Sequence, residues 1–210
     1  MTLKAGILLF DSVNELDFIG PFEVLANSDY LLRVPLFPGM EISPERLDVQ
    51  LIARTVRPLT CEKGLSVCPT MAIADCDALD ILVVPGGSGV DGVMADEETL
   101  QWIRAVANGC TWLTSVCNGV FILAAAGLTR GKKVTTHWAA LDMLRKTRLT
   151  GPVLDGFQYV RDGNLVTSAG VSAGIDMALW IAGQVTSPER ARLIQRTMQY
   201  DPAPPYAADV

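Results

Sequence analysis

Three short apolar runs alternate with stretches of helical periodicity along this chain. The runs are LKAGILLF at 3–10, LDILVVP at 79–85 and CTWLTSV at 110–116. Such short, continuously apolar runs are typical of strands that are buried on both faces. Strands that alternate with helices pair in parallel, with helices on both faces of the sheet. The pattern therefore predicts a doubly wound α/β domain whose ligand site lies beyond the carboxyl ends of the strands.

The remaining segments extend this pattern over one domain, residues 1–210. A further strand is expected at 47–56, and hairpins are expected to turn near Lys63-Gly64 and at Asp162-Gly163. Apolar spacing predicts helices at 15–27, 97–107, 118–128, 139–147, 172–185 and 188–199.

Prolines interrupt this regular pattern at three places. Gly20-Pro21 predicts a restart of the first helix, because proline suits a first-turn position. Residues 28–46 contain three prolines and are interpreted as a loop or an insertion. The tail 201–210 also holds three prolines, which argues against a helix there.

The composition and net charge limit the kinds of partner that this protein can bind. Its 210 residues are 50% hydrophobic and 19% charged, which excludes a disordered chain. The net charge of −6 argues against a nucleic-acid or anionic-membrane surface. No export signal follows the N-terminus, and no segment reaches the ~20 apolar residues of a membrane span. We therefore expect a cytoplasmic protein with reduced cysteines.

The chain has five cysteines and one histidine, His137. No C-x-x-C pair is present, so a zinc site is not expected. Four of the cysteines are interpreted as buried hydrophobic residues: Cys61, Cys68, Cys76 and Cys110. A disulfide between Cys61 and Cys68 across the first hairpin is a less favoured alternative.

The fifth cysteine, Cys117, directly follows a buried strand and directly precedes a helix of small and apolar residues. Such a strand-to-helix turn, a nucleophile elbow, exposes its side chain in a strained backbone conformation. The helix N-terminus favours the thiolate. Gly119 leaves room for a close approach of the backbone. We therefore expect Cys117 to be the nucleophile, against the alternative of another buried hydrophobe.

Two further loops are expected to meet Cys117 at the sheet edge. Asp17 lies among apolar residues of the first helix, where burial and a nearby thiolate would raise its pKa, so that the protonated acid could both hold the sulfur and donate a proton. A capping role is the alternative. Gly86-Gly87 follow the strand 79–85 and supply bare backbone, either as an amide cradle for developing negative charge or as a tight turn. They do not match a phosphate loop, because no Lys-Ser/Thr follows.

Two other titratable residues are candidates for supporting roles. Asp176 is the one charge in AGIDMALWIAG and could orient the site or stabilise the first turn of a helix. His137, in VTTHW, is the one imidazole that could act as a base towards Cys117, although a lone histidine beside Trp138 is more often structural.

Taken together, these motifs resemble the ThiJ/PfpI superfamily, with its flavodoxin-like sheet, and more closely its isocyanide hydratase branch. The elbow motif TSVCNGVFILAAAG indicates the superfamily. The segments LDFIGPFEVL, AGIDMAL and YDPAPPY indicate the branch. The matching segments cover about half of the chain, and the region 27–71 matches poorly.

The resemblance implies a role for each candidate. Cys117 would be the nucleophile and Asp17 its acid partner. Gly86-Gly87 would match the amide cradle, and Asp176 a hydrogen-bonding aspartate of the site. The resemblance also implies a homodimer with sites near the subunit interface, and no metal or organic cofactor.

One position departs from the branch, which usually has threonine after the cysteine where this chain has Asn118. A threonine hydroxyl donates and accepts at one atom, whereas an asparagine amide divides these roles between two. PfpI-type members instead place histidine there. Regulators of the AraC type share the elbow and TTHW but add a helix-turn-helix domain, which is not expected in a chain with this proline-rich tail.

The expected reaction is addition of water to an isocyanide, which gives an N-substituted formamide through a covalent thioimidate on Cys117. Two alternatives remain open. One is a Cys117 hydrolase or glyoxalase-like enzyme that uses His137 as its base. The other is a non-catalytic sensor whose thiol is oxidised or traps electrophiles.

Overall fold

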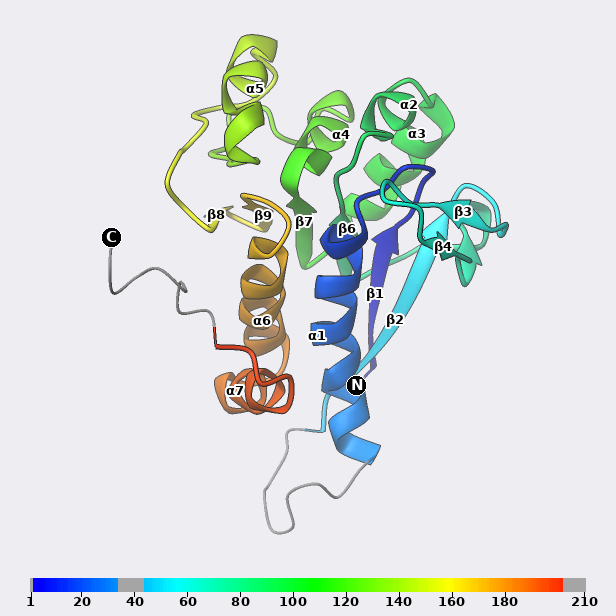
Figure 1. Ribbon diagram of the computed structural model, residues 1–210, viewed down its shortest axis with the longest axis vertical. Coiled ribbons are helices and arrows are strands. Elements are labelled where there is room, and N and C mark those ends of the chain that lie inside the picture. Colours follow the sequence, from blue (N-terminus) through cyan, green and yellow to red (C-terminus); the bar gives the residue numbers. More distant parts are fainter. Residues whose placement is uncertain (1, 34–43, 202–210) are drawn as a thin grey trace.

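A seven-stranded sheet forms the centre of the computed structural model, which describes residues 2–33 and 44–201 (Figure 1). The strand order is β5-β2-β1-β6-β7-β9-β8. All neighbours pair in parallel except the edge strand β8, which is antiparallel to β9. The strands are β1 (Thr2–Leu8), β2 (Arg46–Ala53), β5 (Met71–Ala72), β6 (Ile81–Val84), β7 (Trp112–Val116), β8 (Tyr159–Asp162) and β9 (Leu165–Ser168).

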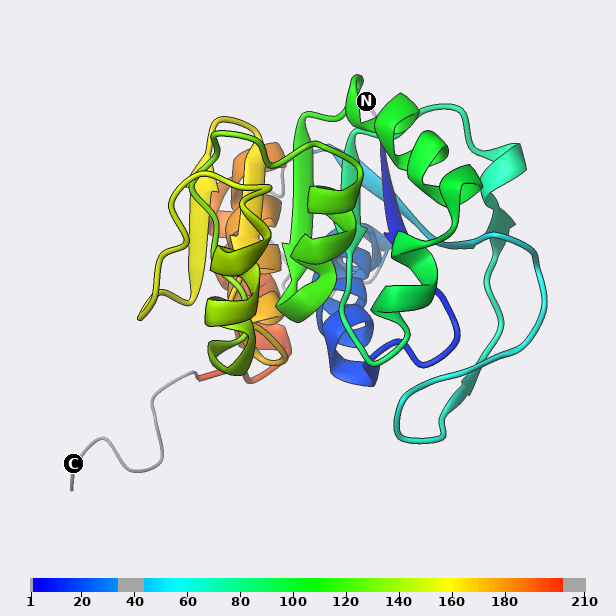
Figure 2. The ribbon, with the colours of Figure 1, turned by 90° about the horizontal axis from the view of Figure 1, so that it is seen from above.

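Helices cover both faces of the sheet, which confirms the mostly parallel, flavodoxin-like α/β architecture. One face carries α1 (Glu15–Arg33), α6 (Ala173–Val185) and α7 (Pro188–Thr197) (Figure 2). The other face carries α3 (Glu97–Ala107) and α4 (Val120–Ala125), with the short α2 (Val90–Met94) against both. The helix α5 (Leu141–Thr147) follows a 3-10 turn at Trp138–Ala140.

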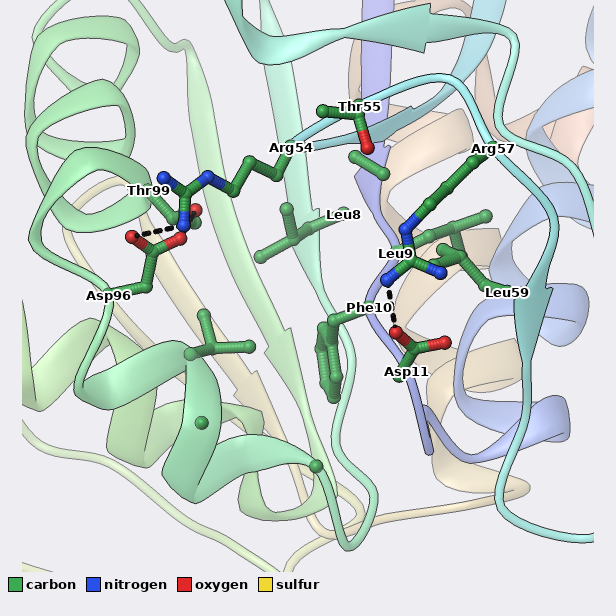
Figure 3. Close-up of a pocket in the computed structure, with 14 residues that line it drawn as sticks. Leu8, Leu9, Phe10, Asp11, Arg54, Thr55, Arg57, Leu59, Asp96 and Thr99 are labelled. Carbon is green, nitrogen blue, oxygen red and sulfur yellow. Dashed lines mark hydrogen bonds and ion pairs between the residues drawn. The ribbon is translucent and has the colours of Figure 1, made fainter.

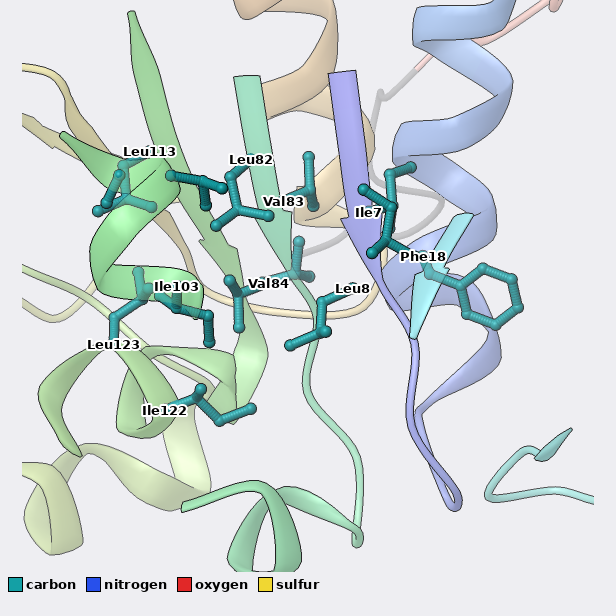
Figure 4. Packing of buried hydrophobic residues seen from close by; sticks show 14 of the residues in the cluster. Ile7, Leu8, Phe18, Leu82, Val83, Val84, Ile103, Leu113, Ile122 and Leu123 are labelled. Carbon is teal, nitrogen blue, oxygen red and sulfur yellow. The ribbon is translucent and has the colours of Figure 1, made fainter. Parts of the chain in front are cut away.

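The buried core follows the period of two along the central strands. Leu8 and Val84 point towards α3 and α4, whereas Ile7 and Val83 point towards α1 (Figure 4). All four side chains are at most 2% exposed. Each such side chain stabilises the fold by ~1.5–3 kcal/mol through removal of apolar surface from water. The core thus holds the central strands and their carboxyl ends in fixed positions.

The register places the loops after β1, β6 and β7 at one edge of the sheet. Ile7 pairs with Val83 of β6, and Val84 pairs with Ser115 of β7. These strands therefore end side by side. The loops that follow them contain Asn14, Gly86 and Cys117, so the expected meeting of these three loops is observed.

A separate hairpin lies beside these loops. Its strands β3 (Leu59–Thr60) and β4 (Ser66–Val67) are antiparallel, with Thr60 opposite Ser66. Gly64 has a φ of 96°, a conformation that glycine adopts without steric cost. This confirms the turn expected near Lys63-Gly64. The second expected hairpin, β8–β9, is confirmed as well.

The first helix differs from the prediction. Instead of a restart at Gly20-Pro21, α1 is continuous over Glu15–Arg33, with Pro21 inside it. The reason is packing against α6. A Cβ atom on Gly20 would lie 2.9 Å from Ile175 Cγ1, so the glycine allows the two helices to approach closely. Tertiary contacts of this kind outweigh the ~3 kcal/mol penalty of an interior proline.

The interpretation of 28–46 as a loop or insertion is wrong at its start. Residues 28–33 belong to α1, and β2 begins at Arg46. Residues 34–43 lie outside the described part of the chain, as does nearly all of the tail 201–210. The short elements α2 and β5 were not predicted, because neither carries enough residues to show a period. No helix within 2–33 and 44–201 is long and apolar enough to cross a membrane.

Candidate active site

Cys117 occupies the turn that joins β7 to the following helical segment. Its φ is 56°, in the left-handed region that costs a residue with a side chain about 1 kcal/mol or more. A 3-10 turn over Cys117–Gly119 leads directly into α4. Gly119 packs against the end of β6, where a Cβ atom would collide with the Val84 carbonyl oxygen and lie 2.6 Å from that of Pro85. The turn therefore requires glycine at 119.

Asp17 lies in the first turn of α1 and is fully buried, at 0% exposure. Its Oδ2 accepts a hydrogen bond from the Gly86 amide at 2.9 Å, whereas its Oδ1 is buried without a conventional partner. Burial raises the pKa of Asp17 to about 6, and the amides of Gly86 and Val171 oppose this rise. A carboxyl group with such a pKa exchanges protons near neutral pH, as general acid–base chemistry requires.

The thiol of Cys117 and the carboxyl group of Asp17 form a coupled pair. Burial, and after it the charge of Asp17, raise the pKa of Cys117 to about 12. The Asn118 amide has the opposite effect but is weaker than burial. The amide at the start of the helical segment therefore favours the thiolate, as expected, but burial outweighs it. At neutral pH the pair therefore holds one proton, which lies on the sulfur.

The loop after β6 contacts both sides of this pair through two consecutive amides. Gly86 N–H donates to Asp17, and Gly87 N–H donates to Asn118 Oδ1 at 2.8 Å. Asn118 Nδ2 in turn donates to the Gly87 carbonyl oxygen at 3.1 Å. Both amides thus bind protein side chains and do not form the open cradle that the glycines predicted. Their role in this geometry is to hold Asp17 and the turn at Cys117 together.

A third loop, after β9, borders the sulfur. A Cβ atom on Gly170, which has a φ of 138°, would lie 3.3 Å from Cys117 Sγ and 3.1 Å from His137 Cδ2. Val171 has a φ of 45°, an unusual value for a β-branched residue. Neither residue was predicted from the sequence. The one sequence feature that could have indicated this contact is Gly170 in the pair Ala169-Gly170 ahead of α6, since glycine often marks a close approach of the backbone to another group.

His137 lies beside Gly170, the residue that borders the sulfur, and presents a carbon atom to it. Its Cδ2 faces Gly170, as described above, and its Nδ1 accepts a long hydrogen bond from the Ala139 amide at 3.4 Å. His137 makes no hydrogen bond to Cys117. Thr136 contributes instead, because its Oγ1 donates to the Cys117 carbonyl oxygen at 2.8 Å. The segment 136–137 therefore supports the turn without supplying a base in this geometry.

The β3–β4 hairpin brings charge to the site, which the sequence did not reveal. Glu62 N–H donates to the Val13 carbonyl oxygen at 2.9 Å, and Asn14 Nδ2 donates to Glu62 Oε2 at 2.8 Å. The Glu62 carboxylate raises the pKa values of both Asp17 and Cys117, whereas the Lys63 ammonium lowers that of Asp17. The hairpin therefore tunes the proton affinity of the pair.

Asp176 is placed away from these contacts. Tyr200 Oη donates to its Oδ1 at 3.2 Å, and partial burial raises the pKa of the Asp176 carboxyl group. None of its hydrogen bonds reaches Cys117 or Asp17. Asp176 therefore connects α6 with the segment after α7.

The other cysteines lack these features. All five are free thiols, so the disulfide across the hairpin is absent. Three of the remaining four are buried, and the fourth, Cys68, is exposed on the hairpin side. Within residues 2–33 and 44–201, no cluster of three or more His, Cys, Asp or Glu side chains could hold a metal ion.

A hollow of about 280 Å³ lies behind the loop after β1, outside the Cys117 pair (Figure 3). Leu8 and Phe10 lie between its two charged ends. At one end Arg54 pairs with Asp96 at 3.2 Å, and at the other Arg57 pairs with Asp11. Both guanidinium groups already have carboxylate partners, so this hollow offers no unpaired charge and no nucleophile.

The strand–turn–cysteine arrangement corresponds to a known family. The sequence profile of the DJ-1/PfpI family matches residues 3–184. The chain belongs to the DJ-1/PfpI family. Among characterised relatives, it is 42% identical over 206 residues to an isonitrile hydratase of Pseudomonas putida, with 98% of this chain and 82% of that protein covered. A solved ThiJ/PfpI family protein from Pseudomonas syringae superposes with a TM-score of 0.84 at 29% identity, over all of this chain and 80% of that one.

More distant DJ-1/PfpI relatives include regulators. The transcriptional regulator CdhR of Pseudomonas aeruginosa is 31% identical over 137 residues, which cover 64% of this chain and 39% of the regulator. Membership of the DJ-1/PfpI family therefore fixes the fold but includes proteins of different function. The choice among them depends on the residues of the site and on the extent of the match to each relative.

Proposed function

We propose that this protein is an isocyanide hydratase, which adds water to an isocyanide and releases an N-substituted formamide. The observation that carries the proposal is the pair of Cys117 and Asp17 at the carboxyl edge of the sheet, in which the charge of Asp17 raises the pKa of the thiol. The 42% identity to the isonitrile hydratase, over nearly the whole chain, supports the same reaction. The site brings a soft nucleophile and a proton carrier to one point, as addition to a terminal carbon requires.

In the first step, Cys117 Sγ attacks the terminal carbon of R–N≡C and forms the S–C bond. The proton that the pair holds moves to that carbon, so the product is a neutral thioimidate, S–CH=N–R, and Asp17 is left as a carboxylate. Because Asp17 is already hydrogen-bonded to the Gly86 amide, it stays in place when it becomes charged. This step needs no free imidazole.

In the second step, the Asp17 carboxylate takes a proton from water while the water oxygen adds to the same carbon, and Asp17 then passes this proton to the imine nitrogen. The C–S bond then breaks as the C=O bond forms, and formamide R–NH–CHO leaves. The hydroxyl proton returns to the pair. The raised pKa of Asp17 supports both directions of transfer, because an acid near neutrality can donate in one step and accept in the next.

We assign Asn118 and Gly87 to positioning in this mechanism. Their two hydrogen bonds fix the loop whose neighbouring amide holds Asp17. Gly86 also needs to be glycine, since a Cβ atom there would collide with Asn118 Oδ1 and lie 2.9 Å from Asp17 Oδ2. Asp176 would act at a distance from the reacting atoms, through its contact with Tyr200.

We further propose a cytoplasmic homodimer with sites near the subunit contact. Leu16 and Ile19, on either side of Asp17 in sequence, are each 38% exposed on α1. Leu65 of the nearby hairpin is exposed as well. Exposed apolar side chains beside a buried site favour cover by a second copy. Size-exclusion chromatography with light scattering tests this, and a monomeric mass would contradict it.

The test of the function itself is direct. Incubation with an alkyl isocyanide should yield the N-alkylformamide by NMR, and Cys117→Ala and Asp17→Asn should abolish turnover. Cys68→Ala is the matched control, because this exposed thiol lies outside the site and its loss should leave turnover unchanged. Absence of formamide, or full turnover by Cys117→Ala, would contradict the proposal. If His137→Ala alone abolished the reaction, a Cys–His enzyme would replace it, and oxidation without turnover would indicate a thiol sensor.

A further inference from the structure

The proline-rich segment at 201–210 is a sequence motif that the candidate active site does not use. Its sequence is DPAPPYAADV, and three of the four residues 202–205 are proline. Proline fixes its own φ and disfavours the helical conformation of the residue before it, so such a sequence favours the extended polyproline II form. Polyproline II has no internal hydrogen bonds, and proteins bind it in grooves lined by aromatic side chains.

A hollow of about 260 Å³ on the surface of this protein has aromatic walls of this kind. It is lined by residues from two segments, 135–138 and 155–158, and by Ala169. Two of these lining residues are large and aromatic: Trp138 is 76% exposed, and Phe157 is 55% exposed. The part of the chain that the structure describes therefore leaves both rings accessible to a binding partner.

Two hydrogen-bond donors accompany the aromatic rings. Neither the indole N–H of Trp138 nor the side-chain amide of Gln158 has a hydrogen-bond partner among residues 2–33 and 44–201. The two threonines of the hollow, in contrast, donate within the protein: Thr135 Oγ1 to the Leu154 carbonyl oxygen and Thr136 Oγ1 to that of Cys117. The hollow thus combines aromatic surface with free donors, which suits the unpaired carbonyl groups of a polyproline II segment.

The described chain ends within reach of this hollow. Tyr200 Oη donates to Asp176 Oδ1 at 3.2 Å, and Asp176 lies about 5 Å along α6 from its first residue, Ala173. A turn closed by the Ala173 amide joins α6 to Ala169, which lines the hollow. The nine residues 202–210 would span about 28 Å in polyproline II form, at ~3.1 Å per residue. This length is ample for a segment that starts beside α6.

We propose that the segment 202–210 of the same chain binds in this hollow, with its prolines and Tyr206 against Trp138 and Phe157. The indole N–H of Trp138 and the Gln158 amide donate to carbonyl groups of the segment. Because the prolines restrict the segment before it binds, its ordering costs little conformational entropy. The contact holds the end of the chain against the domain and removes two aromatic rings from water. It does not depend on the reaction at Cys117, since Cys117 does not line the hollow.

The first test measures oxidation of Trp138 by hydroxyl radicals in the full-length protein, with mass spectrometry to report each modified side chain. Tyr206→Ala combined with alanine at the three prolines of the segment should raise the rate at Trp138 about tenfold, the change expected if about nine molecules in ten have the segment bound. Tyr30, which is 51% exposed near the end of α1, is the internal control and should keep its rate. Equal rates at Trp138 in the wild type and the variant would overturn the proposal.

The second test is a photo-crosslink from the segment itself. Tyr206→benzoylphenylalanine in the full chain should form links to Trp138 or to 155–158 on irradiation, and Trp138→Ala should reduce their yield. Links confined to residues outside the hollow would overturn the proposal. A mixture of isotope-labelled and unlabelled protein separates the sources, because links between the two isotopes would assign the segment to a second copy instead. Trp138 protection that is lost on dilution, and not on substitution of the segment, would overturn it in favour of an interface between copies.

Discussion

The side chain of Asn118 and the backbone of Gly87 hold each other through two opposed hydrogen bonds. Gly87 N–H donates to Asn118 Oδ1 at 2.8 Å, and Asn118 Nδ2 donates to the Gly87 carbonyl oxygen at 3.1 Å. The preceding amide, Gly86 N–H, binds Asp17. One loop therefore connects the residue after the candidate nucleophile with the carboxyl group that is proposed to move its proton.

Replacement of Asn118 by alanine removes both bonds and tests this connection. Each partner left unpaired costs about 1 kcal/mol, so Asn118→Ala should lower the free energy of unfolding by about 2 kcal/mol. Turnover should fall at least tenfold, because the Gly86 amide no longer holds Asp17 in one place. Urea denaturation and formamide production measure the two effects.

Asn27→Ala is the matched control for that experiment. Asn27 is another buried amide, whose Nδ2 donates to the Glu23 carbonyl oxygen at 2.9 Å within α1. Its loss should cost stability but leave turnover per folded molecule unchanged. If both asparagine variants lost activity in proportion to stability, the positioning role of Asn118 would be refuted.

The buried carboxyl group of Asp17 makes stability depend on pH. Burial raises its pKa from 3.8 to about 6, so between these values the folded protein keeps a proton that the unfolded chain has released. Stability therefore falls as the pH rises through this window. The difference amounts to about 3 kcal/mol when complete.

Asp17→Asn removes this dependence and should separate stability from function. At pH 8 the variant should be more stable than the wild type by up to about 3 kcal/mol, at pH 4 the two should be similar, and turnover should be lost at both. Urea denaturation at both pH values measures this. The exposed Asp91 serves as the control position, since Asp91→Asn should show no such difference. If Asp17→Asn were less stable than the wild type at pH 8, burial of the ionised Asp17 carboxylate would not destabilise the fold, and the prediction would be wrong.

The hairpin charges should shift the pH dependence of turnover in opposite directions. Glu62 raises the pKa of Asp17 and Lys63 lowers it. Glu62→Gln should therefore move the apparent pKa of kcat/KM to lower pH, and Lys63→Met should move it to higher pH. Measured pH profiles from 4.5 to 9 would check both, with Glu97→Gln on α3 as a control that leaves the profile in place. Shifts of the same sign in both hairpin variants would contradict the assignment.

The sequence predicted the elements whose period is carried by their own residues. The amphipathic run 97–107 is found as α3 over Glu97–Ala107, and the buried runs are found as β1, β6 and β7. The continuous α1 was not predicted, because its passage through Pro21 depends on packing against α6, which local sequence does not encode.

For the site, the sequence singled out Cys117 and Asp17, because a turn after a buried strand and an acid in an apolar helix are local patterns. It did not indicate the contact between Asn118 and Gly87, which lie 31 residues apart, or between Asn14 and Glu62, which lie 48 apart. It also did not indicate that burial outweighs the helix N-terminus and raises the pKa of Cys117, since burial appears only in the folded chain.

Gly119 provides the last prediction, because it sets how closely the Cys117 turn packs on β6. A Cβ atom there would collide with the Val84 carbonyl oxygen, which belongs to the buried end of a central strand and cannot move freely. Gly119→Ala should therefore lower stability by about 1–3 kcal/mol and displace Cys117 from Asp17, with loss of turnover. Gly92→Ala is the matched control, because nothing lies within 4 Å of a Cβ at Gly92 in α2. That variant should gain up to about 1 kcal/mol from helix propensity and keep full turnover. Equal behaviour of the two variants in denaturation and turnover assays would show that the turn tolerates a side chain and that the close packing is not required.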